Sequence, residues 1–164
     1  MIKSFKITTK DDTKRLAKAL AALSLPSTAL LLQGDLGAGK TTLTRYLCQA
    51  LGIDPKQVAS PTFSIIHEYE GGRVPVAHVD LYRLGQGVDI YDLGLDEYID
   101  RGFFIIIEWA QLMDGALDFP YIKVTLRLLP DGIRQAVVEI PEDMADYDQI
   151  FKDLGVKDDE GTCS

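Results

Sequence analysis

Residues 34–41 read Gly34-Asp35-Leu36-Gly37-Ala38-Gly39-Lys40-Thr41 and match the phosphate-binding pattern G-x-x-x-x-G-K-[ST] at every fixed position. An apolar run at 29–32 precedes the motif, and a good helix-forming stretch follows it at 40–51. In this strand–loop–helix setting the pattern forms a P-loop. The glycines let the backbone curl around a phosphate, and the helix N-terminus adds partial positive charge. The stretch therefore predicts a nucleotide-binding site.

The residues of the loop have distinct predicted roles in holding a nucleoside triphosphate. We expect the backbone of Gly37, Ala38 and Gly39 to line the phosphates. The Lys40 ammonium would reach the β- and γ-phosphates, and the Thr41 hydroxyl would hold Mg²⁺. Thr42 follows directly and places a second hydroxyl near the α-phosphate.

Two carboxylates at the ends of predicted strands are candidates for completing this site. The apolar run at 103–107 ends in Glu108, which is the Walker B pattern of an acid that meets Mg²⁺ or its waters. Asp80 ends a predicted strand at 74–80, and we expect it in the Mg²⁺ shell or beside the attacking water. The structural alternatives are a surface acid for Glu108 and a helix cap for Asp80.

Four further residues have less specific signals. Thr62 lies in Ser60-Pro61-Thr62-Phe63, where a threonine of a P-loop switch can sense the γ-phosphate, although a simple turn explains Ser-Pro almost as well. Trp109 follows Glu108 and is expected in the core, where it would still report on nucleotide. His67 and His78 each stand without a ligand cluster, so we predict packing roles and reject metal binding or histidine-based catalysis for them.

The hydrophobic periodicity predicts alternating strands and helices. Strands are expected at 2–8, 29–33, 64–69, 74–80, 103–108, 121–129 and 133–140. Helices are expected from a cap at Asp11 or Asp12 to about residue 23, at 40–51, once or twice within 85–101, and at 146–154. The strands 64–69 and 74–80, and the strands 121–129 and 133–140, should form hairpins. This mixture predicts a three-layer α/β fold of the P-loop NTPase type, with a mixed central sheet flanked by helices and the nucleotide at the carboxyl ends of the strands.

Length and charge limit the classes of function. The chain of 164 residues predicts one P-loop ATPase domain over 1–155 and an acidic, disordered tail over 156–164. The net charge of −8 argues against direct nucleic-acid binding, which needs clustered Lys and Arg. The acidic end is either a solubilising segment or a docking surface for a basic partner. The N-terminus lacks a signal peptide, no apolar run could cross a membrane, and the two cysteines form no disulfide framework, so we expect a cytoplasmic protein.

Four blocks in this order and spacing resemble the TsaE (YjeE-type) family of small bacterial P-loop ATPases, over about residues 2–140. They are the loop at 34–42, Ser60-Pro61-Thr62-Phe63, Asp80-Leu81-Tyr82-Arg83-Leu84 and Ile107-Glu108-Trp109. The chain departs from many relatives at Ala110, where they have proline, and in its longer, more acidic segment from Glu142 onward.

The resemblance implies an ATPase subunit in the synthesis of threonylcarbamoyladenosine in tRNAs that read ANN codons. It implies ATP and Mg²⁺ as cofactors and a TsaB–TsaD heterodimer as partner, with tRNA reached only through that complex. By the family's pattern Lys40, Asp80 and Glu108 would be catalytic, with Thr41 and Glu108 as the Mg²⁺ ligands. Nucleotide contacts would come from Gly37 to Thr42, from Thr62 in a switch-like segment, and from Lys10 and Thr13 near the base.

Three other functions remain as alternatives. A small-molecule kinase would need an arginine-rich lid, whereas the arginines here are scattered. A GTPase would need an Asn-Lys-x-Asp element, and the chain has no asparagine. A module that binds ATP for assembly without hydrolysing it uses the same residues. No arginine finger is identifiable, so we expect the isolated chain to be a slow ATPase that a partner activates.

Overall fold

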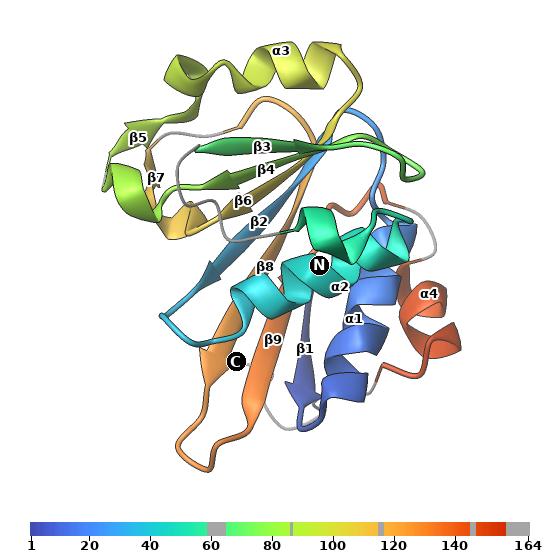
Figure 1. The fold of residues 1–164 in the computed structure, drawn as a ribbon. Coiled ribbons are helices and arrows are strands. Elements are labelled where there is room, and N and C mark those ends of the chain that lie inside the picture. Colours follow the sequence, from blue (N-terminus) through green and yellow to red (C-terminus); the bar gives the residue numbers. More distant parts are fainter. Residues whose placement is uncertain (59–64, 86, 115–116, 145–146, 157–164) are drawn as a thin grey trace.

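The fold is described here from a computed structural model, which defines residues 1–58, 65–85, 87–114, 117–144 and 147–156. Its centre is a seven-stranded sheet with the order β1-β9-β8-β2-β6-β4-β3 (Figure 1). The strands are β1 (Ile2–Ile7), β2 (Thr28–Gly34), β3 (Ile66–Tyr69), β4 (Val76–Asp80), β6 (Phe104–Glu108), β8 (Tyr121–Leu128) and β9 (Arg134–Glu139).

The sheet is mixed, as the sequence predicts. Strands β2, β4, β6 and β8 run parallel, whereas the β3–β4 and β8–β9 pairs are the two expected antiparallel hairpins. Strand β1 closes the other edge by pairing antiparallel with β9. The carboxyl ends of β2, β4 and β6 therefore meet at one edge of the sheet, which is where an α/β sheet of this kind binds ligands.

Helices cover both faces of the sheet and make three layers (Figure 1). The principal helices on one face are α1 (Lys10–Ala22), α2 (Lys40–Ala50) and α4 (Tyr147–Asp153), while α3 (Leu95–Asp100) lies on the other. Strand β2 shows how the layers are built, because Leu30 and Leu32 enter the first core and Ala29 and Leu31 enter the second. This period of two on a strand buried on both sides explains its unbroken apolar run.

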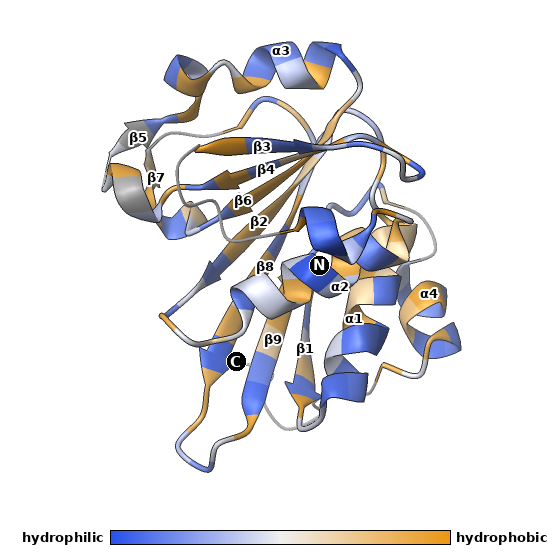
Figure 2. Cartoon of the chain, in the orientation of Figure 1, coloured by the Kyte–Doolittle hydropathy of each residue, from blue (hydrophilic) through white to orange (hydrophobic). Residues whose placement is uncertain are grey.

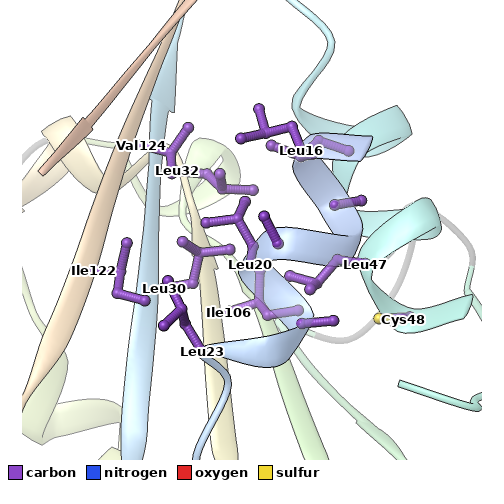
Figure 3. Close-up of a cluster of buried hydrophobic side chains, with 14 of the residues drawn as sticks. Leu16, Leu20, Leu23, Leu30, Leu32, Leu47, Cys48, Ile106, Ile122 and Val124 are labelled. Atoms are coloured by element: carbon purple, nitrogen blue, oxygen red, sulfur yellow. The ribbon is translucent and has the colours of Figure 1, made fainter. Parts of the chain in front are cut away.

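The larger core is made by α1 and α2 packing on the sheet. In Figure 3, Leu16 and Leu20 of α1 point toward Leu30 and Leu32 of β2, and all four side chains are buried. Figure 2 shows the central strands as predominantly hydrophobic and α1 as hydrophobic and hydrophilic in turn. Leu43 and Leu47 of α2 are buried in the same core, and α2 begins at Lys40.

Helix α1 begins earlier than expected. Its N-cap is Thr9, whose hydroxyl accepts from the Asp12 backbone N–H while the Asp12 carboxylate accepts from the Thr9 N–H. The prediction of a cap at Asp11 or Asp12 is therefore wrong, because a threonine followed three residues later by a short acid forms a capping box. Burial alone would raise the pKa of Asp12, but the hydrogen bonds from Thr8 and Thr9 outweigh it and leave that pKa below its usual value.

The remaining elements are short. The region 85–101 contains the 3-10 helix η3 (Ile90–Leu93) and α3, in agreement with one or two short helices. The sequence pattern did not indicate the 3-10 helices η1 (Pro55–Gln57), η2 (Tyr82–Leu84) and η4 (Ala110–Leu112), or the small parallel pair of β5 (Val88–Asp89) with β7 (Met113–Asp114). Helix α4 lies within the expected range, and the tail predicted for 156–164 lies almost entirely outside the described residues.

Candidate functional site: a phosphate loop facing two strand-end carboxylates

The loop between β2 and α2 is shaped by glycines that no other residue could replace without strain. Gly34 ends β2 with φ of +146°, and a Cβ atom there would lie 2.5 Å from the Leu126 carbonyl oxygen on β8. Gly39 has φ of +106° and forms the N-cap of α2 without a side-chain cap. The first N–H groups of α2 have no side-chain partner at this cap, and they are the donors that a helix N-terminus offers to an anion.

Lys40 is held inside this loop. Its side chain is buried, and its Nζ donates to the carbonyl oxygens of Gly34, at 2.6 Å, and Asp35, at 2.8 Å. An ammonium has three N–H donors, so one remains for a phosphate oxygen. Burial lowers the pKa of Lys40, and the negative charges of Glu108, Asp35 and Asp80 partly oppose that shift. An anion placed beside it would favour the charged form further.

The two predicted acids lie side by side at the strand ends. Asp80 of β4 pairs in register with Glu108 of β6, and Glu108 in turn lies opposite Leu32 of β2. Glu108 is buried, and its Oε1 accepts a hydrogen bond of 3.3 Å from the Thr41 hydroxyl at the start of α2. The half-buried Asp80 accepts from the Tyr82 backbone N–H at 3.0 Å, which fixes its carboxylate at the end of the strand.

His78 packs in the interior as predicted, and it also contacts Glu108 of the candidate site. The imidazole is fully buried, with Nε2 2.5 Å from Glu108 Oε2 and Nδ1 3.0 Å from the Tyr69 hydroxyl. Burial raises the pKa of the Tyr69 phenol, and the charge of Glu108 adds to that rise. A sequence signal existed, since His78 precedes Asp80 by two residues and therefore shares its face of β4.

Trp109 packs against the second core, in part as expected, but it also lies beside the loop. Its backbone is left-handed, with φ of +61° and ψ of +40°, and this turns the chain away from β6 directly after Glu108. The indole ring is half-buried, 4.8 Å from the Tyr82 ring between centroids, and the Lys40 ammonium lies 4.0 Å from its centroid. The neighbouring Gln111 side chain donates to the Gly34 carbonyl at 3.2 Å, which links the turn to the loop.

Two cavities flank the loop. One, of about 390 Å³, is lined by Leu36, Gly37, Gly39, Lys40, Thr41, Thr42, Asp80, Tyr82, Glu108, Trp109 and Arg134. The other, of about 280 Å³, is lined by Ile7, Thr8, Thr9, Lys10, Thr13, Ala38, Gly39, Thr42, Leu43, Leu126, Gly132 and Arg134. They share Gly39, Thr42 and Arg134, and the Arg134 guanidinium donates to the Gly37 carbonyl at 3.4 Å.

The structure thus brings the predicted site residues together on both sides of one loop. Lys40, Thr41, Asp80 and Glu108 line the larger cavity, whereas Lys10 and Thr13 line the smaller one. Thr62 lies outside the described residues. Arg134, which the scattered arginines of the sequence did not single out, reaches the loop from β9 because the β8–β9 hairpin runs beside it.

The donor atoms of the larger cavity fit a magnesium ion. Mg²⁺ prefers hard oxygen ligands and usually takes one or two carboxylates together with phosphate oxygens and waters. Thr41 Oγ1 and Glu108 Oε1 lie 3.3 Å apart, and the Asp80 carboxylate is at the end of the neighbouring strand. These residues would hold the ion between the first turn of α2 and the sheet.

Comparison with known proteins places this geometry in a family. The sequence model for "Threonylcarbamoyl adenosine biosynthesis protein TsaE" matches residues 7–143. The tRNA threonylcarbamoyladenosine biosynthesis protein TsaE of Bacillus subtilis is 41% identical over 125 residues, covering 76% of this chain and 77% of that protein. Its counterpart in Rickettsia bellii is 38% identical over 128 residues, covering 78% and 88%.

A solved structure agrees with the sequence matches. The crystal structure of Bacillus subtilis YdiB superimposes with a TM-score of 0.69 at 29% sequence identity, over 94% of each chain. The sequence match over residues 7–143 spans the loop, both strand-end acids and the β8–β9 hairpin. The chain therefore belongs to the TsaE family of threonylcarbamoyl adenosine biosynthesis proteins.

Proposed function

We propose that this chain has a P-loop NTPase fold, binds ATP with Mg²⁺, and hydrolyses it in the synthesis of threonylcarbamoyladenosine in tRNAs that read ANN codons. One observation carries the ATPase part. Thr41 at the start of α2 and Glu108 at the end of β6 are hydrogen-bonded at 3.3 Å beside the buried Lys40 and above the phosphate loop. This is the arrangement that P-loop enzymes use to position a β,γ-phosphate pair and its metal.

The chain's own residues have separate tasks in this reaction. The N–H groups from Gly37 to Thr42 surround the β- and γ-phosphates. Lys40 adds a positive charge that is already in position, so it need not reorient during the reaction. Thr41 and Glu108 supply oxygen ligands, and the Asp80 carboxylate orients a water at the strand end. Bound Mg²⁺ supplies neutralisation of the charge that grows on the phosphate oxygens. For Thr62 we propose a γ-phosphate-sensing role.

The smaller cavity is the proposed site of the nucleoside. It opens on the opposite side of Gly39 and Thr42 and includes Lys10 and Thr13 of α1. Thr13→Trp would fill part of its volume of about 280 Å³ from the side of α1, whereas Lys40 and Thr41 line the larger cavity rather than this one. We expect this variant to lose affinity for ATP by about tenfold or more while binding inorganic tripolyphosphate as the wild type does. Equal losses for both ligands would place the nucleoside elsewhere.

Membership of the TsaE family supports the role in tRNA modification. The proposed partner is a TsaB–TsaD heterodimer, which would hold the tRNA, because a chain with a net charge of −8 is a poor direct binder of nucleic acid. None of the helices in the described ranges has the length and apolar composition to span a bilayer. We propose a cytoplasmic protein that hydrolyses ATP slowly alone and faster with its partners.

ATP turnover by the purified chain, alone and with the TsaB–TsaD pair, tests the proposal. A slow basal rate that rises with the pair and vanishes in Lys40→Ala is the expected result. ATP bound without turnover, with or without the pair, would instead indicate an assembly module. ATP consumption that depends on a small metabolite and ignores the pair would contradict the proposed role.

A further inference from the structure

A buried chain of hydrogen bonds runs from the edge of the sheet to the P-loop helix. It links Tyr69 of β3 to His78 of β4 at 3.0 Å, His78 to Glu108 of β6 at 2.5 Å, and Glu108 to Thr41 of α2 at 3.3 Å. Tyr69, His78 and Glu108 are each at most 2% exposed. Four residues from four elements are therefore connected through side chains alone at the point where the site is proposed to hold its metal ion.

The donors and acceptors of this chain can be assigned from chemistry. An ionised carboxylate only accepts, so the imidazole must donate to Glu108 from Nε2–H. In a neutral imidazole Nδ1 is then an acceptor, and the Tyr69 O–H donates to it. The Thr41 O–H donates to the other oxygen of Glu108. In this arrangement each of the four side chains has its hydrogen-bond partner. The Tyr69 hydroxyl favours the His78 tautomer that can donate to Glu108.

The sheet explains why the contact exists. Strands β3 and β4 pair antiparallel, with Tyr69 opposite Val76, and β4 pairs parallel with β6, with His78 opposite Ile106. Side chains two positions apart share a face, so Tyr69, His78 and Glu108 all project toward α2. Glu108 and His78 meet along the diagonal between neighbouring strands, and this contact occupies Oε2 on the side away from Thr41.

We propose that His78 is a positioning residue for the proposed magnesium ligand Glu108: it holds Oε2, so that only Oε1 faces Thr41 and the cavity. Because Oε2 is held by His78, Glu108 would bind the ion through Oε1 alone. This inference rests on the proposed function. Without His78 the carboxylate could rotate about its last torsion angle and lose the direction of Oε1. Loss of such a supporting contact typically lowers metal affinity or activity by 10–100-fold.

Three substitutions of His78 distinguish a role in orienting Glu108 from a role in packing alone. His78→Gln retains an amide N–H near the place of Nε2, whereas the shorter side chain in His78→Asn retains only a polar group near the place of Nδ1. His78→Leu keeps a side chain of similar size and removes the polar groups at both nitrogen positions. His67→Leu is the matched control, because His67 is the cross-strand neighbour of His78 and is not in contact with Glu108 by any hydrogen bond among the described residues. Thermal unfolding of each variant reports on folding.

The first measurement requires neither metal nor turnover. The chain has two histidines, so the imidazole ¹⁵N shifts of the metal-free protein, assigned with the His67→Leu spectrum, reveal the tautomer of His78. We expect the Nε2–H form, in which Nδ1 accepts from the Tyr69 hydroxyl. An Nδ1–H tautomer would overturn the proposal, whatever the outcome for ATP hydrolysis.

The second measurement is the Mg²⁺ dependence of ATP binding and hydrolysis. For His78→Leu we expect the half-saturating Mg²⁺ concentration to rise by about 10–100-fold and kcat to fall, with KM for ATP at saturating Mg²⁺ within about twofold of wild type. His78→Gln should recover most of the loss and His78→Asn should not, and this comparison also decides the matter if His78→Leu does not fold. Equal behaviour of the Gln and Asn variants, or wild-type Mg²⁺ dependence in His78→Leu, would refute positioning. If the wild type itself does not hydrolyse ATP, the proposed function fails, while the tautomer and the Mg²⁺ dependence of binding still decide the role of His78.

Discussion

The Lys40 ammonium lies 4.0 Å from the centroid of the Trp109 indole ring, across the mouth of the larger cavity. A cation over the face of an indole is attracted by the ring's negative quadrupole. The same ammonium donates to two carbonyl oxygens of its own loop. Lys40 is therefore already confined to the position from which it would meet a phosphate, and the indole forms one wall of that position.

Binding of Mg·ATP should change the emission of Trp109. A phosphate beside Lys40 adds negative charge close to the ring and draws the ammonium toward the ligand, and Trp109 is the sole tryptophan of the chain. Titration with ATP should give a saturable change in intensity or wavelength that Lys40→Ala abolishes. An unchanged spectrum, together with ATP binding measured by calorimetry, would place the phosphates away from this ring.

Glu108→Gln should separate binding from turnover. The amide preserves the size of the side chain and can still accept from His78, but it removes the negative charge beside Thr41. We expect ATP affinity within a few-fold of wild type and kcat lower by about 10²-fold or more. Equilibrium binding and steady-state kinetics measure the two effects. Glu97→Gln, an exposed substitution on α3, is the charge-matched control and should leave both unchanged.

Replacing two glycines of the loop with alanine should lower the free energy of unfolding by different amounts. A Cβ at Gly34 would lie 2.5 Å from the Leu126 carbonyl oxygen, whereas a Cβ at Gly37 would meet nothing within 4 Å. Both positions have positive φ, so Gly37→Ala should cost about 1–2 kcal/mol of unfolding free energy from backbone strain alone. Gly34→Ala should cost about 1–3 kcal/mol more from the clash. Urea denaturation of the pair measures the difference, and equal losses would argue against the close approach of β2 to β8.

Alkaline pH should destabilise the fold through Cys48. Burial, and secondarily the charge of Glu108, raises the pKa of this thiol to about 12. In the unfolded chain a thiol ionises near about 8.5, so above that pH the unfolded state releases its proton first and is favoured. The contribution of the thiol to the free energy of unfolding is thus fully present below about pH 8. It falls by about 1.4 kcal/mol per pH unit as pH rises through 9 and 10.

The comparison with Cys48→Ala tests this dependence. Urea denaturation of both proteins from pH 7 to 10 should show a steeper loss in the wild type, by about 2 kcal/mol at pH 10. Groups that titrate in this range and lie away from Cys48 are common to both proteins and cancel. Parallel pH profiles would show that the thiol ionises as readily in the folded protein as in the unfolded chain.

Local patterns predicted the features that depend on neighbours in the sequence. The loop motif, the acids at two strand ends and the two hairpins follow from spacing and turn residues, and the structure confirms this arrangement. The spacing of His78 and Asp80 indicates only that they share a face of β4, whereas the contact of His78 with Glu108 and Tyr69 depends on the order β6-β4-β3 of the sheet, which no local pattern encodes. Trp109 packs against the second core as expected, but its contact with Lys40 depends on the left-handed turn after Glu108, which the sequence did not indicate. At the start of α1, several polar residues could cap the helix, and only the observed geometry selects Thr9.

The pairing of the first strand with the last has a consequence for how the chain is made. The backbone amine of Met1 donates to the Ile140 carbonyl, 139 positions away, and among the described strands β1 pairs with β9 alone. At ordinary rates of translation, synthesis of the intervening chain takes on the order of ten seconds. During that interval β1 has no strand to pair with on the ribosome, and the sheet cannot close at this edge until the last hairpin has emerged. Folding of the sheet should therefore finish only once β9 is available, and β1 lacks this partner strand in the meantime.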